Sequence, residues 1–281
     1  MECIYANKPE NLLCRCWMTK YFDSHAHYDN SNFNADRKEL LAKLPLAGVE
    51  GVINAGACVS SSKASVALAE EYSYIYATVG VHPHEASKMK DSDLDTIKSL
   101  SQHKKTVAIG EIGLDFHYDN SPREIQRKRF AEQLALAKSL DMPVVIHSRE
   151  AAAETMAIIK ESGVSKGVLH CYSGHLPMAL QYIEMGFYIS LSGVITYKNA
   201  EKSREVAAGI PLEYLMIETD APYLTPVPFR RERNDSTKLP FIAEIIAEVR
   251  GITTDAVSKA TTENVKRMYQ KLGEGEPIVI A

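Results

Sequence analysis

The segment Tyr21-Phe22-Asp23-Ser24-His25-Ala26-His27 has the pattern of a β-strand that ends in two histidines. Because side chains alternate between the two faces of a strand, we expect His25 and His27 to point the same way, with Asp23 below them. Two imidazoles on one face can bind a borderline-soft divalent cation such as zinc. A lone His-x-His pair is also common among surface or hydrogen-bonded histidines, so the rest of the chain must decide between the two interpretations.

Similar short, β-branched runs follow this segment, mostly about 30 residues apart, which is the length of one βαβ unit. The eight predicted strands are Tyr21–Ser24, Gly51–Asn54, Ile75–Val79, Thr106–Gly110, Val144–Ile146, Gly167–Leu169, Phe187–Leu191 and Leu215–Ile217. They are mostly apolar and lack strict alternation, as is typical of strands buried on both faces. The pattern predicts an α/β fold, a closed TIM (β/α)8 barrel. The alternative is an open doubly wound sheet, but the chain has no GxGxxG turn.

Helix signals fill the intervals between these runs. Asn34 is a favourable N-cap residue, and Pro122 sits at a plausible first helical position after Ser121. The expected helices include Ala35–Lys43, Ser61–Tyr72, a helix from Pro122 toward Leu140, an eighth helix over Lys238–Arg250 and an extra C-terminal helix over Thr254–Leu272. Since Met18 immediately precedes the first strand, we expect residues 1–17 to be an extension outside the fold and residues 18–275 to form one barrel domain.

Composition bounds the possible functions. The 281 residues are 45% hydrophobic, which is enough for a large buried core. A net charge of -4 gives no global basic field for nucleic acid or acidic membranes, although an enzyme that holds phosphate with a metal and a few arginines remains possible. Five cysteines without CxxC spacing predict neither a disulfide framework nor a structural zinc site, which favours a cytoplasmic location. We find no apolar run of about 18 residues and therefore expect no membrane helix.

The carboxyl ends of barrel strands form the active-site face of this fold. Six residues with metal-ligand chemistry lie at or just after these ends: His25, His27, Glu111, His147, His170 and Asp220. We expect one divalent ion at His25, His27 and Asp220, and a second at His147 and His170, with Glu111 bridging both. Singly, each residue is more often a structural group, but six on one face rarely coincide by accident. Zinc, manganese, nickel or magnesium would suit this set.

Several motifs also resemble a known family. FDSHAH, GVHPH, GEIGLD, VIHSR, LHCYSG and IETDAPYL occur in family order between Tyr21 and Tyr269, and they are similar to the TatD family of metal-dependent hydrolases in the amidohydrolase superfamily. The resemblance implies a TIM barrel, a divalent-metal centre and hydrolysis of DNA phosphodiesters, often by exonucleases. It places metal ligands on the same six residues. The chain departs from the family pattern at residues 230–236, RRERNDS, where the family usually has an RGKRNEP-like stretch.

The catalytic candidates are Asp220, as the acceptor of a proton from a metal-activated water, and Glu111, as the bridge between the ions. The candidates on the substrate side are His82, Arg149, Glu218 and Ser173. Arg149 could hold a phosphate oxygen, or simply be a surface arginine. His82 fits a family histidine that steadies phosphate or protonates a leaving group, the alternative being a neutral histidine held by its loop. Glu218 shares the face of Asp220 one layer deeper, where it would orient a ligand.

We therefore expect a TatD-type deoxyribonuclease. The first alternative is an amidohydrolase that acts on a lactone, amide or other ester, because the same metals polarise a carbonyl. A weaker alternative is a non-catalytic interaction barrel. The expected partner is DNA or another phosphate ester, not a membrane, and a monomer is favoured.

Overall fold

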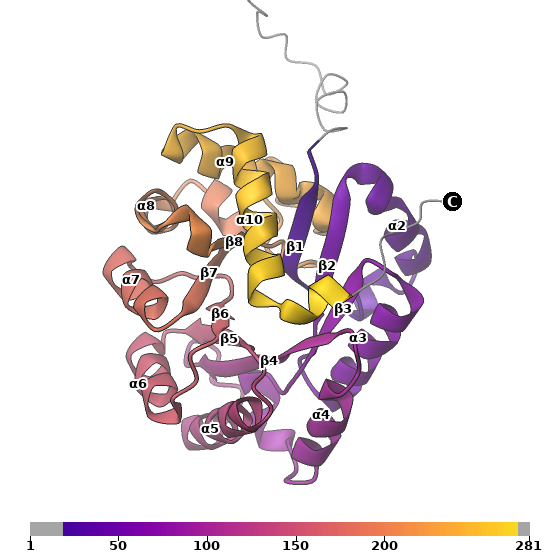
Figure 1. Ribbon diagram of the computed structural model, residues 1–281, viewed down its shortest axis with the longest axis vertical. Helices are drawn as coiled ribbons and strands as arrows, with labels where there is room; N and C mark the ends of the chain where they lie inside the picture. Colours follow the sequence, from indigo (N-terminus) through magenta and orange to yellow (C-terminus); the bar gives the residue numbers. More distant parts are fainter. Residues whose placement is uncertain (1–18, 275–281) are drawn as a thin grey trace, which may run out of the picture.

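The computed structural model describes residues 19–274 and contains one eight-stranded parallel sheet that closes into a barrel (Figure 1). The strands follow one another around the barrel in chain order, from β1 to β8. An isolated bridge between Ala26 and Ala221 joins the two ends of the sheet. The predicted TIM barrel is therefore confirmed. The expected extension over residues 1–17 lies outside the described residues, as does residue 275.

All eight predicted strands are present. They are β1 Tyr21–Ala26, β2 Val49–Ala55, β3 Ile75–Val79, β4 Thr106–Asp115, β5 Val144–Arg149, β6 Gly167–Leu169, β7 Phe187–Leu191 and β8 Leu215–Ile217. The bounds of β3, β6, β7 and β8 are as predicted. The strands β4 and β5 run further than their apolar cores, because pairing continues through Gly113 with His147 and Asp115 with Arg149. The predicted strands stop where polar residues or glycines follow the apolar run. Backbone pairing does not require apolar side chains, so the observed strands continue past these residues.

Helices surround the strands on the outside (Figure 1). They are α2 Arg37–Lys43, α3 Val59–Glu71, α4 Asp93–Ser101, α5 Arg123–Ser139, α6 Ala152–Ser162, α7 Leu176–Glu184, α8 Glu201–Gly209, α9 Leu239–Arg250 and α10 Thr254–Met268. Short 3-10 helices cover Ser31–Phe33, Pro45–Ala47, Pro83–Lys88, Gly193–Thr196, Leu212–Tyr214, Ser236–Lys238 and Gln270–Glu274.

All five predicted helices differ from the observed ones at one end or both; α3 and α9 are each displaced by only one or two residues. Asn34 does not cap α2; it follows the 3-10 turn Ser31–Phe33, and α2 begins after Asp36. Pro122 is the N-cap residue of α5 and not its first helical residue, so the helix begins one residue later than expected. The C-terminal helix stops at Met268 and continues as a 3-10 turn. Local propensity marks where helices can begin, but the packing of each helix on the barrel selects the first residue.

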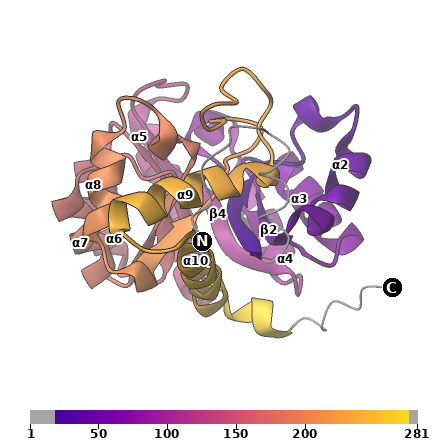
Figure 2. The ribbon, with the colours of Figure 1, turned by 90° about the horizontal axis from the view of Figure 1, so that it is seen from above.

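The inside of the barrel is apolar at the end where the strands begin. There Phe22, Val107 and Val145 form a buried cluster with Met268 and Tyr269 at the end of α10. The helix α10 lies across this end of the barrel, as Figures 1 and 2 show together. In this fold the active site lies at the opposite end, where the strands finish. Within residues 19–274, no helix combines the length and apolar character needed to span a membrane.

Candidate metal centre

The histidine pair at the end of β1 forms the first part of the site. The Nε2 atoms of His25 and His27 lie 3.1 Å apart. Oδ1 of Asp220, which follows β8, lies 3.4 Å from Nε2 of His27 and 3.8 Å from that of His25. Ala26 pairs with the loop of β8, so the two strand ends are held side by side. These three side chains converge as the sequence predicted for one cation.

Asp23, which the strand pattern places below the two histidines, bonds to the backbone and to hydroxyl groups. Its carboxylate accepts hydrogen bonds from the backbone N–H groups of His25 and Thr219 and from the hydroxyls of Thr219 and Ser236. Burial raises the pKa of Asp23 to about 7, against the lowering effect of these donors. The β1–β2 register carries one extra residue between Asp23 and Ala26, which interrupts the alternation. Asp23 therefore ties β1 to the backbone next to Asp220 and contacts neither imidazole of the pair.

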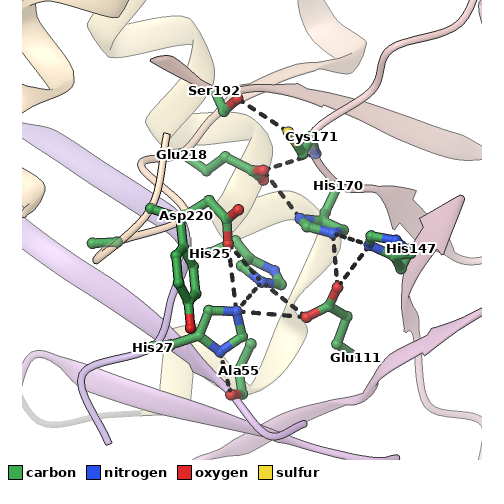
Figure 3. A network of polar contacts seen from close by, with 12 residues as sticks. His25, His27, Ala55, Glu111, His147, His170, Cys171, Ser192, Glu218 and Asp220 are labelled. Atoms are coloured by element: carbon green, nitrogen blue, oxygen red, sulfur yellow. Dashed lines mark hydrogen bonds and ion pairs between the residues drawn. The ribbon is translucent and has the colours of Figure 1, made fainter. Parts of the chain in front are cut away.

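Glu111 of β4 stands between two groups of histidines (Figure 3). Its Oε2 atom lies 3.4 Å from Nε2 of His25 and 3.6 Å from Nε2 of His27. Its Oε1 atom lies 3.1 Å from Nδ1 of His147 and 2.8 Å from Nε2 of His170. The side chain is only 3% exposed. One oxygen thus faces each pair, which is the arrangement required of a carboxylate shared by two cations.

In three histidines, one ring nitrogen faces Glu111 or Asp220, and the other, here called the outer nitrogen, faces away. The partners of the outer nitrogens show whether these histidines suit a metal. Nδ1 of His27 lies 3.0 Å from the carbonyl of Ala55, and Nδ1 of His170 lies 3.2 Å from Oε1 of Glu218. Nε2 of His147 lies 3.1 Å from Oδ2 of Asp115. Since a carbonyl or carboxylate oxygen can only accept, each outer nitrogen donates, and the inner nitrogen that faces Glu111 or Asp220 can bind a cation once any proton on it has left. Metal-binding histidines are held in this way, so these residues fit divalent cations.

The electrostatics of the cluster favour positive charge. Burial alone would raise the pKa of Glu111, but the imidazoles of His170, His82 and His25 hold it well below its usual value. Burial alone would lower the pKa of His27, yet Asp220 and Glu111 raise it to about 9. The buried carboxylates therefore retain their negative charge and favour protonated imidazoles. Divalent cations can replace these protons and balance the same negative charge.

His82 begins the turn after β3 and adds a fifth imidazole. Its Nε2 lies 3.3 Å from Oε1 of Glu111, and its Nδ1 accepts the backbone N–H of His84 at 3.1 Å. Burial lowers the pKa of His82 to about 4. Accepting at Nδ1 fixes the neutral tautomer with its proton on Nε2, so His82 is a hydrogen-bond donor beside Glu111. This geometry suits steadying a phosphate oxygen better than protonating a leaving group.

The other predicted substrate residues lie in different places. Glu218 is completely buried behind His170, where it contacts that ring and also accepts the backbone N–H of Cys171 at 2.7 Å. The expected task of Glu218, orienting a ligand, stays a prediction. Ser173 is exposed and lines a cavity of about 220 Å³ beside His170. Arg149, the last residue of β5, is exposed over the ring of Tyr118.

Asp115 and His84 were not singled out from the sequence. Oδ2 of Asp115 contacts Nε2 of His84 at 2.8 Å as well as the His147 ring, and its Oδ1 accepts the backbone N–H groups of His117 and Tyr118. Asp115 is the last residue of the motif GEIGLD, and His84 is the last residue of GVHPH. The signal was therefore present, but the pairing of Asp115 with the end of β5 is visible only in the folded barrel.

Comparisons with known proteins identify the family of the chain. The family model described as "TatD related DNase" matches residues 22–270. The Bacillus subtilis protein named "Uncharacterized metal-dependent hydrolase YabD" is 41% identical over 89% of this chain and 98% of its own length. The Klebsiella pneumoniae protein named "3'-5' ssDNA/RNA exonuclease TatD" is 34% identical over 88% and 97%. The crystal structure of YjjV, a TatD homologue from Escherichia coli, is 32% identical, covers 89% of this chain and 98% of its own, and has a TM-score of 0.84.

Proposed function

The chain belongs to the TatD family of metal-dependent hydrolases, and from this premise we propose that it is a nuclease that hydrolyses DNA phosphodiester bonds at two divalent cations. The observation that carries the proposal is the position of Glu111. Its two oxygens face different histidine pairs, and its pKa is held well below the usual range. Burying a carboxylate is costly because the charge loses its water. Cations held between the two histidine pairs would compensate for that cost.

His25, His27 and Asp220 would hold one cation, and His147 and His170 the other, with Glu111 common to both. Divalent cations held by these residues would stabilise negative charge on a phosphate and make water more acidic. Imidazole and carboxylate together suit zinc, manganese or nickel, and magnesium less well. The protein contributes the fixed ring orientations, through the acceptors behind His27, His147 and His170.

Asp220 is the residue placed to accept a proton. Its side chain is 15% exposed, so it meets solvent at the open end of the barrel. Its backbone N–H donates to the carbonyl of His25 at 2.9 Å, which fixes the carboxylate beside the His25–His27 pair. Burial alone would raise the pKa of Asp220, but His27, His25 and His170 hold it below its usual value. An anionic carboxylate at this point can take the proton of an attacking water.

Arg149 and His82 are proposed to hold the phosphate. Within the described part of the chain, Arg149 forms no ion pair, and its guanidinium rests on the ring of Tyr118 with 4.7 Å to the centroid. By contrast, Arg233 is paired with Asp36 and rests on Phe33. Arg149 therefore keeps its donors available for an anion, and His82 adds a neutral donor next to Glu111.

We further propose that residues 18–275 form the hydrolase domain, that the protein acts in the cytoplasm and that it is monomeric. The family match, which begins at residue 22, supports the first point. The free thiols of Cys58 and Cys171 are compatible with a reducing compartment.

Elemental analysis of the purified protein, together with a hydrolysis panel, tests the proposed function. The panel contains single-stranded and double-stranded DNA, RNA, nucleotides and lactones, with Glu111→Gln as the control variant. We expect about two bound divalent ions and cleavage of DNA by the wild type only. Hydrolysis of lactones without any cleavage of nucleic acid would instead establish the amidohydrolase alternative, and a protein that takes up no metal would disprove both.

A further inference from the structure

Two exposed tyrosines stand on opposite sides of the metal centre. Tyr223 follows β8 and is 49% exposed, and Tyr118 follows β4 and is 55% exposed. In a ring of eight strands in chain order, β8 and β1 lie across from β4 and β5. The His27–Asp220 side of the cluster is therefore next to Tyr223, and the His147 side is next to Tyr118.

Tyr223 is held rigidly despite its exposure. Its backbone N–H donates to the carbonyl of Asp220 at 2.8 Å, and its own carbonyl accepts Nδ2 of the fully buried Asn234 at 2.6 Å. Its hydroxyl accepts Nδ2 of Asn30 at 2.9 Å. The ring centroid lies 6.3 Å from that of His27. A tethered aromatic ring that remains half open to solvent offers a flat surface which loses little conformational entropy on binding.

The side of the metal centre opposite Tyr223, here called the opposite wall, carries the positive charge of Arg149. The ring of Tyr118 supports the guanidinium of Arg149 and meets His84 edge-on, with 5.4 Å between centroids. Tyr118 is itself fixed by its backbone N–H, which donates to Asp115. The two walls thus differ in chemistry: one is an open aromatic face, and the other is an arginine supported by an aromatic ring.

We propose that Tyr223 is the stacking platform for the nucleobase next to the scissile phosphate, and that Arg149 on Tyr118 holds the strand across the centre. The proposal rests on the nuclease function proposed above. A base can lie on Tyr223 only after it has left its partner and its neighbours, because a ring within a duplex has no free face. Tyr223 therefore selects unpaired ends of single strands. Every base has a flat aromatic face, so stacking on Tyr223 tolerates any sequence.

The test compares wild type, Tyr223→Phe and Tyr223→Ala on two single-stranded DNA oligonucleotides, one normal and one with an abasic terminal residue. We expect Tyr223→Ala to lower kcat/KM by about ten-fold more on the normal oligonucleotide than on the abasic one. Tyr223→Phe keeps the ring face and should stay within about two-fold of wild type on both. The control is Ile252→Ala, which removes an exposed apolar side chain on the turn between α9 and α10. Equal losses on the two oligonucleotides would overturn the proposal.

A binding experiment separates this proposal from the nuclease function itself. It uses the metal-loaded protein and an oligonucleotide with terminal 2-aminopurine, whose last linkage resists hydrolysis because a methylene replaces the bridging oxygen. Stacking on Tyr223 should quench the 2-aminopurine fluorescence in wild type and Tyr223→Phe, but not in Tyr223→Ala. Quenching that depends on Tyr223 in a protein without cleavage would reject only the nuclease. Cleavage with no such quenching would reject only the platform, and the absence of both would reject both.

Discussion

Oδ2 of Asp115 lies 2.8 Å from Nε2 of His84 and 3.1 Å from Nε2 of His147, so one carboxylate oxygen serves two imidazoles. Of these two rings, only that of His147 reaches Glu111. Because Asp115 accepts at the outer nitrogen, it keeps the lone pair of the inner Nδ1 directed at the proposed cation. Asp115 thus positions the proposed ligand His147 without being one of the six proposed ligands itself.

Asp115→Asn should weaken one of the two cation sites. The amide has a single oxygen for the two backbone N–H groups and the two rings, so its NH₂ group must face a ring nitrogen that donates. His147 then changes tautomer and directs a proton toward Glu111. We expect cation affinity at this site to fall by about 10- to 100-fold, as measured by calorimetric metal titration. The matched control is Asp119→Asn, which changes an exposed carboxylate paired with Arg123. Unchanged dissociation constants for both ions would exclude the positioning role.

Glu111→Gln should keep the barrel folded but lose metal and most activity. The amide is nearly isosteric with the carboxylate, yet it cannot neutralise two cations. Bound cations stabilise the folded state by mass action, so a chelator should lower the Tm of wild type and hardly change that of the variant. Thermal melts with and without chelator measure this difference, and turnover and metal content are determined on the same samples. A variant that retains both metal stoichiometry and turnover would remove Glu111 from the site.

Asp220→Asn should reduce turnover by a factor on the order of 10²–10⁴ while the substrate still binds, because the amide cannot accept a proton. Arg149→Ala should instead weaken binding, and more than Asp220→Asn does. Both are measured as kcat and substrate affinity on a short single-stranded oligonucleotide with metal in excess. Lys259→Ala, on the exposed side of α10, serves as the control for loss of a positive charge. Near-native turnover of Asp220→Asn would require another base.

Metal affinity should rise with pH. In the metal-free chain, Asp220 and Glu111 raise the pKa of His27 to about 9 against the effect of burial, so a proton occupies this imidazole at neutral pH. A cation must displace that proton, and its apparent affinity therefore grows as the pH approaches 9. Calorimetry at pH 7 in buffers of different ionisation enthalpy should detect proton release on binding. Binding without proton release would show that His27 is not among the ligands.

Gly113→Ala should destabilise the barrel next to the site. Gly113 has φ +143°, and a Cβ there would lie 1.9 Å from the carbonyl oxygen of His147. Backbone strain and the overlap together should cost on the order of 2–5 kcal/mol in the free energy of unfolding. Gly251→Ala is the control, because Gly251 also has a positive φ but no atom within 4 Å of its Cβ position. Urea unfolding of the two variants in chelator compares them, and equal losses would contradict the close approach of β4 and β5.

The sequence by itself determined the barrel and the six proposed ligands. Apolar, β-branched runs at a regular interval specify parallel strands that are buried on both faces. Once these strands close into a barrel, every carboxyl end lies on the same rim, so His25, Glu111 and Asp220 had to meet. This inference needs only the order of the strands, which the linear sequence contains.

Only the tertiary structure decided how these residues face one another. The register of β1 has one extra residue between Asp23 and Ala26, and Asp23 accepts hydrogen bonds from Thr219 and Ser236; the pairing of β4 with β5 brought Asp115 to the outer nitrogen of His147. The division of the Glu111 oxygens between two histidine pairs, and the position of Tyr223 across from Arg149, arose in the same way. Register and bulges are set by packing between strands that are distant in the chain, so a short motif carries no record of them.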